Sequence, residues 1–91
     1  MMTKQPLTEE ALCTWMIGAV ARLARVEVAQ VRDSTSFEDL GLSSLAAVTL
    51  AAQLGDAFGV DVDPLVTWDY PTIGEVARAV SGGLVGTRLP G

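Results

Sequence analysis

The run SLAAVTLAAQLGDAF, residues 44–58, constrains the fold most, because it carries apolar side chains on two sides of one predicted helix. A helix at the surface of a small protein normally buries a single apolar arc. One stripe holds the larger anchors: Ala47, Leu50, Ala51, Leu54 and Phe58. The other consists of Leu45, Val48 and Ala52. We therefore assign the first stripe to the core and expect the second to stay substantially exposed.

This helix should begin near Ser43 or Ser44 and run to about Phe58, with Gly59 as its C′ residue. An earlier helix is predicted over residues 8–25. Thr8 is its N-cap, acids occupy its first turn, and its apolar residues recur at steps of three and four: Leu12, Met16, Ala19, Val20 and Leu23.

Two more helices are predicted towards the C-terminus. Asp63 followed by Pro64 fits an N-cap and N1 pair, which indicates a short helix over about residues 64–68. Thr72 and Glu75 form a capping box that opens the last helix, and Gly82 with Gly83 ends it. One face of this last helix is apolar: Ile73, Val76, Ala77 and Val80.

Residues 26–42 show no helical period and contain a cluster of turn formers, so we predict a long loop with a helical turn at residues 36–40. Its apolar side chains should pin it to the core: Val28, Val31, Phe37 and Leu40. Trp68 is also expected to be a core anchor. The predicted architecture is an all-α four-helix bundle, with three main helices, one short third helix and a long first loop. The domain should span residues 8–84, between tails at residues 1–7 and 85–91, and the final TRLPG should be unanchored.

Charge and composition exclude several functions. The net charge of −5 would repel phosphate backbones and anionic lipids, so nucleic acid is not expected as a partner. The longest uncharged apolar stretch, residues 12–21, is well short of the ~20 residues that span a bilayer. No basic flank of a signal peptide precedes this stretch, so we expect a cytoplasmic protein without membrane association. We also expect the protein to be a monomer.

The chain has no histidine and one cysteine, Cys13, which excludes a Ser–His triad, a Cys–His pair and a zinc site. We interpret Cys13 as a buried small apolar residue. No catalytic residue and no metal site are predicted. A self-sufficient enzyme is therefore not expected.

A serine at the start of the central helix points to another chemistry. Unpaired backbone N–H groups and the positive end of the helix dipole would stabilise a phosphate ester formed there. Because the chain offers no base to activate it, the serine suits modification by another enzyme better than catalysis.

Two short motifs flank the second and last helices: Leu40, Gly41, Leu42, Ser44 and Leu45, and then Trp68, Asp69, Tyr70, Pro71 and Thr72. The first matches a D-x-G-x-D-S-L motif and the second an aromatic-Asp-Tyr-Pro-Thr signature. With both motifs the chain resembles the acyl carrier protein family, and especially the carrier domains of polyketide synthases. The resemblance covers about residues 8–84. It implies a four-helix acyl-carrier-like bundle that is not an enzyme, with a covalent 4′-phosphopantetheine arm on Ser44 that holds acyl groups as thioesters.

The resemblance also implies partners. A phosphopantetheinyl transferase would attach the arm from coenzyme A. An acyl-loading enzyme (an acyltransferase or acyl-adenylating ligase), a ketosynthase and other enzymes of polyketide or related fatty acyl biosynthesis would use it. Ser43 stands where the family usually has an acid, and Asp56 is the only acidic residue in the predicted helix over residues 44–58. Docking is therefore expected to rest on Leu45, Val48 and Ala52, with Ser43 beside them.

Two alternatives remain open from the sequence. A peptidyl or aminoacyl carrier of a nonribosomal peptide pathway has the same architecture, although its motif more often reads Gly-Gly-[His/Asp]-Ser-Leu, which GLSSL resembles less. The other alternative is a non-carrier helical adaptor whose exposed stripe binds a partner helix and whose serine is never modified.

Overall fold

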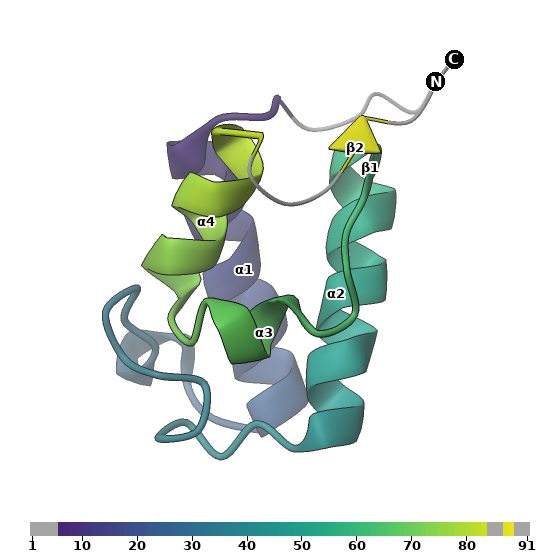
Figure 1. The fold of residues 1–91 in the computed structure, drawn as a ribbon. Coiled ribbons are helices and arrows are strands. Elements are labelled where there is room, and N and C mark those ends of the chain that lie inside the picture. The colour runs from purple at the N-terminus through teal and green to yellow at the C-terminus, as the bar shows by residue number, and fades with distance from the viewer. Residues whose placement is uncertain (1–5, 84–86, 89–91) are drawn as a thin grey trace.

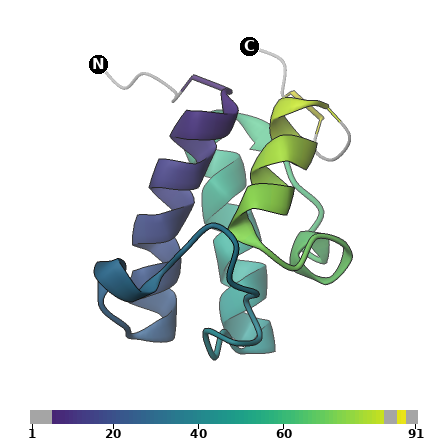
Figure 2. The same cartoon turned by 90° about the vertical axis from the view of Figure 1, so that its left-hand side faces the viewer.

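The helices form a bundle in which α1 packs against both α2 and α4 (Figures 1 and 2). The structure is a computed structural model that describes residues 6–83 and 87–88. Its three long helices and one short helix confirm the predicted all-α four-helix bundle. In chain order the elements are α1 (Glu9–Ala24), the 3₁₀ helix η1 (Val28–Gln30), α2 (Ser44–Phe58), β1 (Val60–Asp61), α3 (Val66–Asp69), α4 (Ile73–Ser81) and β2 (Thr87–Arg88).

The predicted signals for helix ends are present as hydrogen bonds. The Thr8 hydroxyl accepts from Ala11 N at 3.1 Å and caps α1. At the start of α4 the Thr72 hydroxyl accepts from Glu75 N, while the Glu75 carboxylate accepts from Thr72 N, each at 3.2 Å. Gly59 ends α2 with φ of 68°, a left-handed conformation that glycine adopts without the steric cost of a Cβ.

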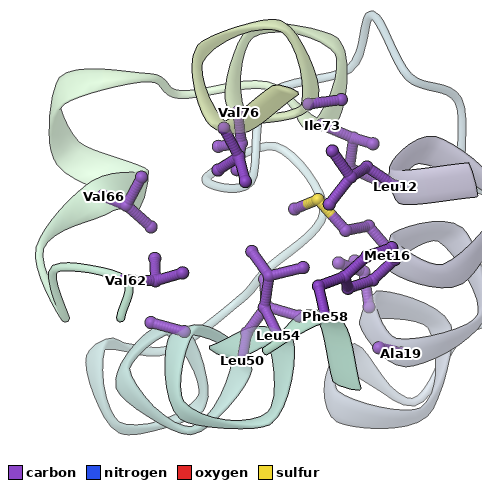
Figure 3. Packing of buried hydrophobic residues seen from close by; sticks show 14 of the residues in the cluster. Leu12, Met16, Ala19, Leu50, Leu54, Phe58, Val62, Val66, Ile73 and Val76 are labelled. Carbon is purple, nitrogen blue, oxygen red and sulfur yellow. The ribbon is translucent and has the colours of Figure 1, made fainter. Parts of the chain in front are cut away.

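The larger stripe of α2 faces the core, as predicted (Figure 3). Leu50 and Leu54 are 1% and 0% exposed, and they meet Leu12 and Met16 of α1 in the same cluster of buried side chains. Helix α4 closes the core with the predicted face: Ile73, Val76, Ala77 and Val80. This face of α2 therefore belongs to one core shared by the three long helices.

The long first loop is tied to the entrance of α4. Phe37 N donates to Pro71 O at 2.8 Å, and Gly74 N donates to Asp33 O at 2.9 Å. The predicted turn at residues 36–40 is present, because Leu40 N donates to Ser36 O at 3.1 Å. The loop thereby holds the start of α2 beside the turn into α4.

The apolar side chains of the loop do not all face inward. Val31 and Phe37 are buried and Leu40 is half-buried, as predicted. The prediction for Val28 is wrong, because this side chain is 57% exposed. Val28 is the first residue of the one-turn 3₁₀ helix η1 and faces solvent. The first buried apolar side chain after it is Val31.

The prediction that Trp68 anchors the core is also wrong, since Trp68 is 54% exposed. Helix α3 is a single turn, and Val66 and Thr67 occupy its inward side. Successive helical residues are about 100° apart, so the residue after this inward pair faces outward.

The start of α3 differs from the prediction as well. The helix begins at Val66 rather than at Pro64, and its N-cap position is Leu65. Asp63 instead closes a turn, in which its carboxylate accepts from Leu65 N at 2.8 Å and its carbonyl from Val66 N at 3.0 Å. Asp63 thus orders the approach to α3 without capping it.

A short antiparallel pairing of β1 with β2 was not predicted. Two-residue strands are too short to show an alternating pattern. Thr87 and Arg88 pair with Asp61 and Val60, so the prediction that TRLPG is unanchored is wrong for these two residues. The predicted tails otherwise fall largely outside the described residues, and Leu7, assigned to the first tail, packs against the core.

Replacing a buried anchor of α2 should destabilise the bundle far more than replacing an exposed residue of the same helix. We expect Leu54→Ala to lower the free energy of unfolding by about 2–5 kcal/mol, because it leaves a cavity in the core. Val48→Ala, on the exposed side, should change it by no more than about 0.5 kcal/mol. Urea denaturation measures both, and equal losses would contradict the assignment of the two faces.

Candidate functional site

Two serines at the start of α2 have different surroundings. Ser43 is the N-cap, and its hydroxyl accepts from Ala46 N at 3.1 Å. Its carbonyl accepts from Ala47 N at 2.8 Å. Ser44 is the first residue of the helix and is exposed. Among the described residues no hydrogen bond engages the Ser44 hydroxyl. Ser43 therefore caps the helix, as predicted, and Ser44 presents a free hydroxyl.

The helix end favours a negative group at Ser44. The N–H groups of Ser44 and Leu45 have no carbonyl partner within the helix, since the first turn lacks the preceding residues. The helix dipole adds partial positive charge at the same end, and no acid lies in the first turn of α2 to neutralise it. A phosphate ester on the Ser44 oxygen would fit this environment.

The backbone before the two serines turns through a glycine. Gly41 has φ of 80°, and a Cβ added there would meet no atom within 4 Å. The requirement for glycine is therefore conformational, because side chains rarely tolerate this region of φ. This glycine directs the loop into the N-terminus of α2 and leaves Ser44 on the surface.

A cleft of about 420 Å³ lies beside Ser44. It opens between the end of the long loop, the start of α2 and α3. Nine residues line it: Phe37, Glu38, Leu42, Ser43, Ser44, Ala47, Thr67, Trp68 and Pro71. The hydroxyl of Ser44 thus stands at a hollow with both apolar and polar walls.

The second stripe of α2 is exposed, as predicted. Leu45 is 78% exposed, Val48 is 40% exposed, and Ala52 is also exposed. Leu65 and Trp68, each 54% exposed, add to the surface near α3, which packs against α2. Of the five large hydrophobic side chains exposed in the described part of the chain, only Val28 lies elsewhere. The sequence did not predict that Leu65 and Trp68 would be exposed. Helix α3 is a single turn, so its apolar residues show no periodic pattern that would indicate which of them face inward.

Cys13 lies on α1 and is half-buried rather than fully buried. Burial raises the pKa of its thiol, and the carboxylates of Asp33 and Glu9 raise it further, against an opposing effect of Arg78. Cys13 therefore stays protonated at neutral pH and is a poor nucleophile. It packs against the core as a small apolar side chain would.

Comparison with known protein families identifies the family of this chain. The family model described as "Phosphopantetheine attachment site" matches residues 14–80, which include both serines and the cleft. The chain belongs to this family. Its members carry covalently attached 4′-phosphopantetheine, and they are carriers that do not themselves catalyse reactions. The alternative of a helical adaptor outside the carriers is thereby set aside.

Curated relatives of this carrier domain include polyketide synthases. It is 40% identical over 72 residues to the phenolphthiocerol synthesis polyketide synthase type I Pks15/1 of Mycobacterium bovis, covering 79% of this chain and 3% of that protein. It is 32% identical over 66 residues to the non-reducing polyketide synthase PKS1 of Zymoseptoria tritici, covering 72% of this chain and 3% of that one. The chain thus spans a small part of the relatives it matches.

Solved structures agree on the fold. A free-standing peptidyl carrier protein from an Acinetobacter baumannii secondary metabolic pathway aligns with a TM-score of 0.79 and 26% identity, covering 87% of this chain and 99% of that one. The HMG-ACPI domain of the CurA module from Lyngbya majuscula aligns with a TM-score of 0.77 at 21% identity, covering 92% and 87%, which shows the fold alone. None of the helices described here is long and apolar enough to cross a membrane.

The different surroundings of the two serines predict different effects on stability. Ser43→Ala should lower the free energy of unfolding by ~1 kcal/mol, because it removes the N-cap hydrogen bond to Ala46 N. Ser44→Ala should change it little, since its hydroxyl bonds nothing in the described structure. Thermal or urea unfolding of the two variants measures this contrast, and a larger loss for Ser44→Ala would refute the assignment of Ser43 as the cap.

Proposed function

We propose that this chain is an acyl carrier whose arm is attached at Ser44, and that it presents acyl thioesters to enzymes of polyketide or related fatty acyl biosynthesis. The observation that carries the proposal is the exposed Ser44 hydroxyl at the N-terminus of α2, inside the region that matches the phosphopantetheine family. Ser43 is adjacent, but its oxygen is engaged in capping.

Attachment requires a separate transferase. The Ser44 oxygen would form a bond to the phosphorus next to the pantetheine portion of coenzyme A, and the phosphoanhydride bond would break. Adenosine 3′,5′-bisphosphate would leave, and the hydroxyl proton would pass to a base of the transferase, because this chain has no histidine to accept it. In the product, the N-terminus of α2 would stabilise the charge of the phosphodiester.

The acyl class is inferred from the relatives, which are polyketide synthases. The partners proposed are a phosphopantetheinyl transferase, an acyltransferase or acyl-adenylating ligase, and a ketosynthase or other pathway enzymes. We place the protein in the cytoplasm as a monomer.

The likeness to a peptidyl carrier structure favours one second candidate, an aminoacyl carrier. Loading tests with acyl and aminoacyl donors distinguish the two classes.

Docking is proposed for the exposed stripe of α2: Leu45, Val48 and Ala52, with Ser43 at its end. These apolar side chains are exposed beside the attachment point, and a contiguous exposed apolar surface is typical of a protein interaction site. Every charged residue in positions 33–77 is acidic, so partners should offer an apolar surface without surrounding carboxylates.

Conversion of the chain by coenzyme A and a broad-specificity transferase tests the attachment. Intact-mass spectrometry should show the gain of one phosphopantetheine, because a single serine at the helix end is free. Ser44→Ala should show none. Ser43→Ala is the matched control and should still be modified, since it keeps the Ser44 hydroxyl. Absence of any gain with several transferases would remove the proposal.

Shortening the most exposed side chain of the stripe tests the docking surface. Leu45→Ala should reduce the rate at which a partner enzyme uses the loaded carrier by about tenfold, the effect of losing 1–2 kcal/mol of apolar contact. Val28→Ala is the control, because Val28 is similarly apolar and exposed but lies on η1. Steady-state turnover with a partner measures both, and equal effects of the two changes would count against the stripe.

A further inference from the structure

The cleft beside Ser44 contains a polar group without a partner. Thr67 is 8% exposed and is the only buried polar residue in the described part of the chain. No hydrogen bond joins its hydroxyl to any described residue. Yet within the same residues no side-chain oxygen is both sealed from solvent and unpaired. The Thr67 hydroxyl must therefore reach solvent. Thr67 lines the cleft beside Ser44.

An unpaired hydroxyl at such a position favours a ligand that can form a hydrogen bond. Because the Thr67 hydroxyl reaches solvent, water can satisfy it in the free protein, and a ligand that displaces this water must supply a hydrogen bond in its place. The neighbouring walls are different in character, because Trp68, Leu42 and Pro71 contribute apolar surface. The cleft therefore suits a chain that alternates apolar carbon with amide or hydroxyl groups.

Trp68 is the large apolar wall of this cleft and is 54% exposed. A tryptophan that is neither buried nor engaged in a ring contact leaves a broad face available to a ligand. The other tryptophan is different, since Trp15 of α1 contacts Phe58 of α2 edge-to-face with ring centroids 5.8 Å apart. Only Trp68 lies at the cleft.

We propose that this cleft seats the part of the phosphopantetheine arm next to its phosphate, with Trp68 as the apolar wall and the Thr67 hydroxyl as the hydrogen-bond partner. The inference rests on the proposed attachment at Ser44, which itself lines the cleft. An arm attached at the rim needs no long reach to enter. Pantetheine has the required chemistry, with a branched apolar carbon and a hydroxyl followed by amides.

The seat would hold the arm weakly. One neutral hydrogen bond and contact with one aromatic face are small contributions, so the arm would leave the cleft readily when a partner binds. A carrier that serves several enzymes needs such reversibility.

Nuclear magnetic resonance of the free carrier, before and after modification, tests the proposal. The two indole N–H signals are compared in the apo and holo proteins after the transferase is removed, and Trp68→Phe assigns them. We expect the Trp68 signal to move and cross-peaks to appear between its ring and the methyl groups of the arm. The Trp15 signal should stay, which provides an internal control.

Two variants refine the test. Thr67→Val keeps the shape and removes the hydroxyl, and it should weaken the cross-peaks by about two- to tenfold, the range for one neutral hydrogen bond. Leu65→Ala is the matched control, because Leu65 is as exposed as Trp68 but does not line the cleft. It should leave the cross-peaks unchanged.

The outcomes separate this inference from the proposed function. If intact mass shows full modification but the Trp68 signal and the arm show no contact, the seat is refuted and the carrier function stands. If no modification occurs, the proposed function fails and the seat with it. If Trp68→Ala slows a partner enzyme while the free holo carrier shows no contact, Trp68 is a docking residue and the seat is again refuted.

Discussion

The structure depends on the burial of one face of α2. Leu50 and Leu54 are buried in the same cluster as side chains of α1 and α4, so this face belongs to a core that all three long helices share (Figure 3). Burying this face fixes the rotation of the helix about its axis, so Leu45 and Val48 are left on the outside. The same packing fixes the side of the bundle on which Ser44 is exposed. The core thus determines the site, although no core residue takes part in its chemistry.

The long loop and α3 complete the surroundings of Ser44. The loop is held by the hydrogen bonds from Phe37 N to Pro71 O and from Gly74 N to Asp33 O. These contacts bring the loop, the start of α2 and the turn into α4 together around one cleft. A rigid helix end beside a cleft gives a flexible arm a defined origin.

The sequence predicted the fold where local signals and burial agree. The capping residues Thr8, Ser43 and Thr72 and the larger stripe of α2 were read correctly, because each combines a local hydrogen-bonding preference with helical spacing. The prediction failed at Trp68, where a single turn of helix gives too little periodicity to show which side chains face inward. The pairing of β1 with β2 was missed for a related reason, since two-residue strands carry no pattern of their own. The cleft could not be predicted, because it depends on how distant segments meet.

The central claim is that Ser44, and not its neighbour Ser43, carries the arm. A protease that cleaves before aspartate should release residues 39–55 as one peptide, in which Ser43, Ser44 and Thr49 are the only hydroxyl side chains. Fragmentation of this peptide from the modified protein locates the added group to one residue. The account predicts that every fragment containing Ser44 carries the phosphopantetheine and that fragments ending at Ser43 do not. Finding the group on Ser43 would contradict it.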